Sequence, residues 1–260
     1  MWNQSRRNII PLHKLLQRTH GDVFSKVVLV SPTSLVASYR YTTVATKEPE
    51  TILWIKSFTE NTVFLDIGSN IGVYSLAAYS LGVSAVYSID PLPHNIFELF
   101  TTIHTNRISN IFPVCAYISS DQNLVGVSPD PLALEKHNQV RSAIGDFAGS
   151  GVIIDSSTKP GSYISPALTQ SQFKQLSSVG ITDIKIDVDG SECDVINAIS
   201  PLLQSSSFRS IAIEVRSTTL NTVSQLLNRY SIFEQTEFRD LSDFNKRIES
   251  GRDAMVLFSR

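Results

Sequence analysis

The feature that most constrains the fold is the stretch of residues 62–72. Its apolar run is long enough for one buried strand, contains Asp66 near its end, and is followed at once by Gly68 and Gly72. Apolar residues at helical spacing then begin at Val73. A strand, a glycine turn and a helix in this order form a nucleotide-cradling loop, because the helix start directs unpaired N–H groups toward the strand end. The stretch predicts an α/β fold with a ligand site beyond this strand.

A second short apolar run covers residues 85–89 and ends in Asp90, 22 positions after Gly68 (90 − 68). An acidic side chain at this spacing is placed to accept hydrogen bonds from ribose hydroxyls. The two runs together predict that an adenosine-type ligand binds here.

The spacing of the glycines narrows the choice of ligand. A dinucleotide fingerprint needs a central glycine to clear space for the pyrophosphate, whereas Ser69 and Asn70 stand between the two glycines here. The charge of Asp66 would repel a diphosphate but suits a cation. S-adenosylmethionine carries an adenosine, an ammonium group and a sulfonium, and has no phosphate. We therefore predict S-adenosylmethionine as the cofactor, bound by Asp66, Gly68, Ser69, Asn70, Gly72 and Asp90.

The composition agrees with one α/β domain and an N-terminal extension. The chain has 260 residues, of which 42% are hydrophobic, and a formal net charge of −2. This charge gives no general attraction to nucleic acid, and no apolar segment reaches the roughly 18 residues of a membrane span. The two cysteines, Cys115 and Cys193, form neither a metal pair nor a disulfide framework. We therefore expect a cytoplasmic protein that binds neither nucleic acid nor a metal ion.

Strand and helix patterns alternate from residue 62 onward, which predicts parallel βαβ units in a doubly wound sheet. Strands are expected at residues 63–67, 85–89, 111–118, 184–188, 210–215, 232–238 and 254–259. Helices are expected at residues 71–81, 94–105, 169–179, 192–199 and 220–230.

Two segments lie outside this alternation. Residues 1–47 are interpreted as a small N-terminal cap or extension, and residues 48–260 as the main domain, which opens with a helix over 48–58. Within the cap, the pattern predicts a short helix at 11–19 and strands at 26–30 and 35–44. Residues 119–165 are rich in glycine and proline, and are either a substrate-facing insertion or a surface excursion.

A second distinctive stretch, residues 184–192, carries Asp187, Asp189 and Glu192 at the end of an expected strand. Ligands of open α/β sheets bind beyond the carboxyl ends of the strands, and clustered carboxylates need a cation, a proton or donors nearby. The stretch either faces the reactive end of the ligand or is a charged loop in which Glu192 favours the first turn of its helix.

Residues 64–75 and 184–192 together resemble the FkbM family of S-adenosylmethionine-dependent methyltransferases, and the resemblance covers about residues 48–216. It implies a class I methyltransferase fold, which is a Rossmann-like, mostly parallel sheet of seven strands with the last antiparallel. It also implies O-methylation of a saccharide or another small hydroxylated natural product.

By motif position, the resemblance implies that Asp66, Gly68, Asn70 and Gly72 line the methionine part of the cofactor. It also implies that Asp90 holds the ribose and that Asp187 lies near the reaction centre. The family commonly has Glu at the positions of Asp90 and Asp189, so each aspartate keeps the charge with a shorter reach.

A neutral hydroxyl acceptor benefits from a base that removes its proton. Asp187 and Asp189 are the catalytic candidates, His104 and His137 are weaker ones, and Glu214 is expected to border the same site. Two alternatives to the methyltransferase remain open at this point: an NAD-linked oxidoreductase, and a non-catalytic cofactor-binding scaffold of the same fold.

Overall fold

The centre of the protein is a seven-stranded sheet. The computed structural model describes residues 9–120, 124–129, 151–154, 163–188, 190–235, 244–250 and 253–260. From one edge to the other the strands are β12 (Phe233–Glu234), β13 (Ala254–Ser259), β11 (Ser210–Val215), β10 (Asp183–Ile186), β3 (Val63–Ile67), β4 (Ala85–Asp90) and β5 (Ile111–Cys115).

The direction of the strands confirms the predicted fold class. Strands β11, β10, β3, β4 and β5 pair in parallel, whereas β13 pairs antiparallel with both β11 and β12. The chain therefore starts its sheet in the middle, builds outward to one edge, returns through β10 and β11 and ends antiparallel, as expected for the class I methyltransferase fold. The carboxyl ends of β3, β4 and β10 consequently meet at one edge of the sheet, where ligands of such sheets bind.

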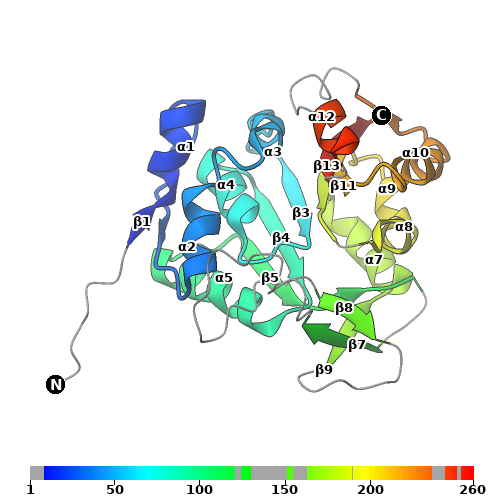
Figure 1. Ribbon diagram of the computed structural model, residues 1–260, viewed down its shortest axis with the longest axis horizontal. Coiled ribbons are helices and arrows are strands. Elements are labelled where there is room, and N and C mark those ends of the chain that lie inside the picture. The colour runs from blue at the N-terminus through cyan, green and yellow to red at the C-terminus, as the bar shows by residue number, and fades with distance from the viewer. Residues whose placement is uncertain are drawn as a thin grey trace.

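Helices cover both faces of the sheet (Figure 1). One face packs against α1 (Leu12–His20), α3 (Pro49–Ile55), α4 (Val73–Leu81) and α5 (Pro93–Asn106). The other face packs against α7 (Gln170–Leu176), α8 (Glu192–Ala198), α9 (Ser200–Leu203) and α10 (Leu220–Asn228). Alternate residues of the central strands supply the two cores, since Phe64 belongs to the first cluster and Leu65 to the second.

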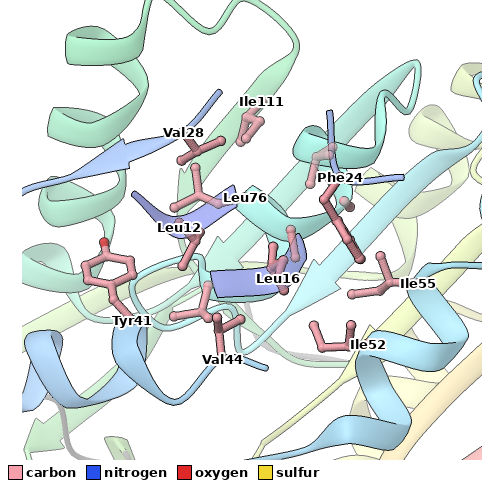
Figure 2. Packing of buried hydrophobic residues seen from close by; sticks show 14 of the residues in the cluster. Leu12, Leu16, Phe24, Val28, Tyr41, Val44, Ile52, Ile55, Leu76 and Ile111 are labelled. Carbon is pink, nitrogen blue, oxygen red and sulfur yellow. The ribbon is translucent and has the colours of Figure 1, made fainter. Parts of the chain in front are cut away.

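Residues 9–47 contribute to the first core. A short antiparallel pair, β1 (Ile10–Pro11) with β2 (Leu29–Val30), flanks α1. Leu12 and Leu16 of α1 are fully buried and lie with Leu76 of α4 and Val44 (Figure 2). The predicted boundary at residue 47 and the role of this segment as a cap stay predictions.

The prediction of a strand at 35–44 is wrong, because this segment forms helix α2 (Leu35–Thr42). The Ser34 hydroxyl caps the helix by accepting the N–H of Ala37 at 3.0 Å. The buried residues of the helix, Ala37 and Tyr41, are four positions apart, which places them on one helical face. The alternation of Tyr39 and Tyr41 suggested a strand, but Tyr39 is exposed.

Residues 119–165, for which no strand or helix was predicted, contribute to a second sheet. Its four strands run in the order β6 (Tyr117–Ile118), β9 (Tyr163–Leu168), β7 (Leu124–Pro129) and β8 (Gly151–Ile154). The single strand expected at 111–118 is divided at Ala116, whose N–H donates to the Asp90 carbonyl at 3.2 Å. Within the described segments, no helix has the length and apolar character needed to cross a bilayer.

We predict that Leu16→Ala lowers the free energy of unfolding by about 2–5 kcal/mol, because it leaves a cavity in the first core. The matched control is Leu35→Ala, since Leu35 is 55% exposed and its loss should stay within about 0.5 kcal/mol. Urea unfolding of both variants measures the difference. Equal losses would show that α1 does not stabilise the sheet.

Candidate functional site

The loop between β3 and α4 has an unusual backbone conformation. Gly68, Asn70 and Gly72 have φ angles of 72°, 52° and 75°. Glycine adopts this left-handed region without steric penalty, and asparagine tolerates it better than most residues do. The sequence of the loop therefore matches the tight path that it follows from strand to helix.

All five N–H groups of residues 68–72 donate within the protein. The N–H groups of Gly68 and Ser69 donate to the Ile89 carbonyl at 2.9 and 3.0 Å. The remaining three donate to the Asp90 carboxylate, to the Asn70 side chain and to the Ser69 carbonyl. The N–H groups of residues 68–72 are therefore not free to face a ligand.

Gly68 also brings the loop against the end of β10. A Cβ atom at this position would lie 1.9 Å from the Asp187 carbonyl oxygen, and the Asp187 N–H donates to the Ile67 carbonyl at 3.0 Å. Only glycine allows so close an approach. The predicted cofactor loop and the predicted reaction-centre residue are therefore neighbours.

Asp90 ends β4 and is almost fully buried. Its Oδ1 accepts hydrogen bonds from the Leu92 N–H at 2.9 Å and from Asn95 Nδ2 at 3.0 Å, and its Oδ2 accepts from the Asn70 N–H at 2.8 Å. An ionised carboxylate has about four lone-pair sites, so one acceptor position remains, on Oδ2. Burial raises the pKa of Asp90 to about 6 although these donors oppose the shift.

Asp66 is fully buried between the sheet and α4. Its Oδ2 accepts the Ser75 hydroxyl at 2.6 Å, and that hydroxyl lies 2.7 Å from Ser88 Oγ. Its Oδ1 and the nearly buried Ser69 Oγ have no hydrogen-bond partner. Burial raises the pKa of Asp66, and the ammonium of Lys185 opposes this shift. Orphaned buried polar atoms are uncommon, and these two fit a polar ligand at the loop.

The strand β10 has one polar and one apolar face. Asp183 and Lys185, followed by Asp187, alternate with the buried isoleucines of the strand. The Lys185 side chain is 1% exposed, and its Nζ lies 2.6 Å from Asp187 Oδ2. The same ammonium lies 4.9 Å from the centroid of the Tyr74 ring, and Lys185 is in register with Asp66. A buried cation therefore separates two of the predicted site carboxylates.

Glu214, on β11, lies beside Asp187, because the residues before them, Ile213 and Ile186, pair between the parallel strands β11 and β10. Burial favours protonation of Asp187, but Lys185 and the Glu214 hydrogen bond outweigh it and lower the pKa of Asp187. The charge of Asp187 and then burial raise the pKa of Glu214. The two pKa values are therefore shifted in opposite directions, as expected for neighbouring carboxyl groups of which one lies against an ammonium.

The cluster of polar residues around Lys185, which includes Asp66, Asp187 and Glu214, extends to the start of α3. Glu48 is 3% exposed and accepts a hydrogen bond from Lys47 Nζ at 3.0 Å. Burial, and then the charge of Glu48, raise the pKa of the Tyr74 phenol. Two charged residues next to the proposed cap boundary therefore reach the same cluster as the strand-end carboxylates.

The structure brings most of the predicted site residues together at the ends of β3, β4 and β10. Among the others, Asp189 and His137 lie outside the described residues. His104 is exposed in the last turn of α5, and the first turn of that helix is the one that follows β4, so His104 lies away from the carboxyl ends. Glu192 accepts the Gly190 N–H at 3.0 Å, which favours the charged-loop interpretation.

Four residues of this cluster were not predicted as site residues from the sequence: Lys185, Tyr74, Glu48 and Lys47. The alternation of acidic or basic residues with isoleucine over 183–187 was the available signal for Lys185, since it indicates a strand with one polar face. Among the described residues, no group of three or more His, Cys, Asp or Glu side chains could hold a metal ion. Cys115 and Cys193 are free thiols.

Comparisons with known proteins give the following neighbours. No protein-family model and no curated protein sequence matches this chain. The ribosomal protein L11 methylase of Lactobacillus delbrueckii subsp. bulgaricus is 14% identical with a TM-score of 0.45, over 81% of this chain and 76% of that one. The precorrin-6y C5,15-methyltransferase of Geobacter metallireducens GS-15 is 10% identical with a TM-score of 0.43, over 80% and 84%.

A third neighbour is an rRNA methylase of Streptococcus thermophilus, which is 9% identical with a TM-score of 0.43, over 82% of this chain and 93% of that one. Similarity this remote carries no information about substrate or mechanism. The fold class of this chain follows instead from its own strand order and from the antiparallel strand β13.

We predict that Gly68→Ala destabilises the protein by about 1–3 kcal/mol more than Gly180→Ala does, because its methyl group must displace the end of β10. Gly180 is a matched control, since its φ of 77° is also left-handed but nothing lies within 4 Å of an added Cβ. Urea unfolding measures both losses. Similar losses would mean that only the backbone conformation matters at residue 68.

Proposed function

We propose that this protein is an S-adenosylmethionine-dependent methyltransferase. Its acceptor is a hydroxyl of a saccharide or another small natural product, as the resemblance to the FkbM family implies. The observation that carries the proposal is the closed loop: its five N–H groups are all used within the protein, and carboxylates surround it. The N–H groups of residues 68–72 are thus not free to bind a phosphate, whereas the carboxylates suit a nucleoside that carries positive charge.

The residues present fit this cofactor. The free acceptor position of Asp90 suits one ribose hydroxyl, and the unpartnered atoms of Asp66 and Ser69 suit the polar methionine part. When bound, S-adenosylmethionine supplies a methyl group that its sulfonium already activates. The proposed task of the protein is then to orient the acceptor and to receive its proton.

Asp187 suits that second task. The Lys185 ammonium beside it favours its ionised form, and its side chain is 27% exposed, in contrast to the fully buried Asp66. The hydroxyl proton becomes strongly acidic as the acceptor oxygen bonds to the methyl carbon, so a carboxylate of low basicity is sufficient. Asp189 stays a second candidate from the sequence.

The two alternatives are disfavoured to different degrees. An NAD-linked oxidoreductase would have to place a pyrophosphate against a loop without free N–H groups and next to Asp66 and Asp187. A non-catalytic scaffold would share the cofactor site, so only turnover separates it from an enzyme. Because the net charge is −2, we propose a small-molecule acceptor in preference to RNA, although several structural neighbours are named as RNA methyltransferases. A cytoplasmic location also stays a prediction.

Calorimetric titration with S-adenosylhomocysteine and NAD tests the cofactor assignment. We expect S-adenosylhomocysteine to bind and to raise the melting temperature, because occupancy of the native state stabilises it, and we expect no effect of NAD. Binding of NAD alone would overturn the proposal.

The ribose contact predicts a dependence of binding on pH. A ribose hydroxyl donates to the ionised form of Asp90, whose pKa is about 6 in the free protein. Protonation therefore competes with binding, and the affinity for S-adenosylhomocysteine should be nearly constant above pH 7 and about tenfold lower at pH 5. Titrations at pH 5, 6, 7 and 8 measure this change. Asp90→Asn is the control, and a wild-type profile as flat as that of the variant would remove the ribose contact.

A further inference from the structure

We infer that Glu214 and Lys185 are positioning residues that together hold Asp187 as an ionised carboxylate facing the acceptor, with Glu214 donating a proton in a hydrogen bond to Asp187. This inference rests on the proposed function for its role in methyl transfer. Its structural part, the protonated Glu214, stands independently.

The contact between Asp187 and Glu214 requires a proton. Ionised carboxylates are acceptors only, so two carboxyl groups that hydrogen-bond must share at least one proton. Asp187 and Glu214 directly follow Ile186 and Ile213, which pair in the parallel ladder of β10 and β11, so the two carboxyl groups lie side by side at the strand ends. Asp187 already accepts the Lys185 ammonium at 2.6 Å, which favours its charged form. The proton therefore resides on Glu214.

Lys185 cannot act on a substrate directly. It is 1% exposed, and the Tyr74 ring lies over its ammonium. Breaking such a buried pair by removing one partner leaves an uncompensated charge. Lys185 thus acts only through the carboxylates beside it, Asp187 and Asp66.

The other groups that face the pair come from the elements around it. Asp66 of β3 and Glu48 at the start of α3 add negative charge, and Lys47 adds positive charge from the same segment as Glu48. With a proton on Glu214, the trio of Lys185, Asp187 and Glu214 is neutral. Without this proton the trio would carry a buried negative charge beside Asp66 and Glu48, which is unfavourable.

The step that this arrangement serves is balanced in atoms and charge. The acceptor oxygen forms a bond to the methyl carbon, the carbon–sulfur bond breaks, and its electron pair stays on sulfur as a neutral thioether. The hydroxyl proton moves to Asp187, which becomes neutral. Because Glu214 is already protonated, it cannot compete for this proton.

The first test is infrared spectroscopy of protein labelled with ¹³C at the glutamate carboxyl carbons. At pH 7.5 we expect the carbonyl stretching band of a neutral carboxylic acid, lost in Glu214→Gln and retained in Glu60→Gln, where the side chain is exposed. No such band in the wild type, or its survival in Glu214→Gln, would overturn the inference. This result does not depend on any ligand.

The second test compares the affinity for S-adenosylmethionine with that for S-adenosylhomocysteine, which lacks the methyl group and the positive charge. In the wild type we expect a constant ratio from pH 8 to pH 5.5, because Asp187 stays ionised. In Lys185→Met the ratio should fall by about threefold or more over this range, since Asp187 then takes up a proton, and Lys185→Arg should restore the constant ratio.

A ratio that stays constant in Lys185→Met would overturn the role of Lys185. If Lys185→Met does not fold, Glu214→Gln and the wild type decide the inference by the infrared band. Failure of both nucleosides to bind the wild type would overturn the proposed function and leave the infrared result standing. The two failures are therefore distinguishable.

Discussion

The candidate site depends on one buried cation. The Lys185 ammonium lies behind the ends of the two central strands, where it pairs with Asp187 and faces Asp66. Without it, carboxylates from neighbouring strands would repel one another in a largely buried place. Its presence explains how the sheet edge carries enough negative charge for a cationic ligand and still folds.

A second constraint is that the N–H groups of residues 68–72, in the loop before α4, all form hydrogen bonds within the protein. Glycine-rich loops at this place in α/β sheets usually offer N–H groups to phosphates. Here the neighbouring strand and Asp90 take those groups, so the loop is held rigidly before any ligand arrives. A preorganised loop of this kind selects by shape and by side-chain charge, which is consistent with the proposed nucleoside.

The strands of the central sheet could be predicted from the sequence, but several residues of the site could not. Strands 63–67, 210–215 and 254–259 were predicted with the bounds that the structure has, because long apolar runs between turn signals leave little ambiguity. Helix α2 was missed, since tyrosines two positions apart imitate a strand although burial follows Ala37 and Tyr41. Short segments of this kind are decided by packing against the rest of the chain.

Lys185 was missed for a related reason. A lysine inside an apolar strand looks like an exposed residue until its partners are known. Apart from Asp187, the charged groups around it come from β3, β11 and the start of α3, which are distant in the sequence. Asp66 and Asp90 were found because their motif is local. Their detailed roles were not, because the number of donors that each carboxylate accepts depends on the folded loop.

The absence of a side chain at Gly68 makes two parts of the molecule move as one. Since the backbone there touches the strand end that carries Asp187, neither can shift without displacing the other. A ligand that displaced the loop at Gly68 would therefore displace the strand end at Asp187 as well. Directed evolution toward a bulkier acceptor would therefore have to change residues of other segments that border the site and keep the contact between Gly68 and Asp187.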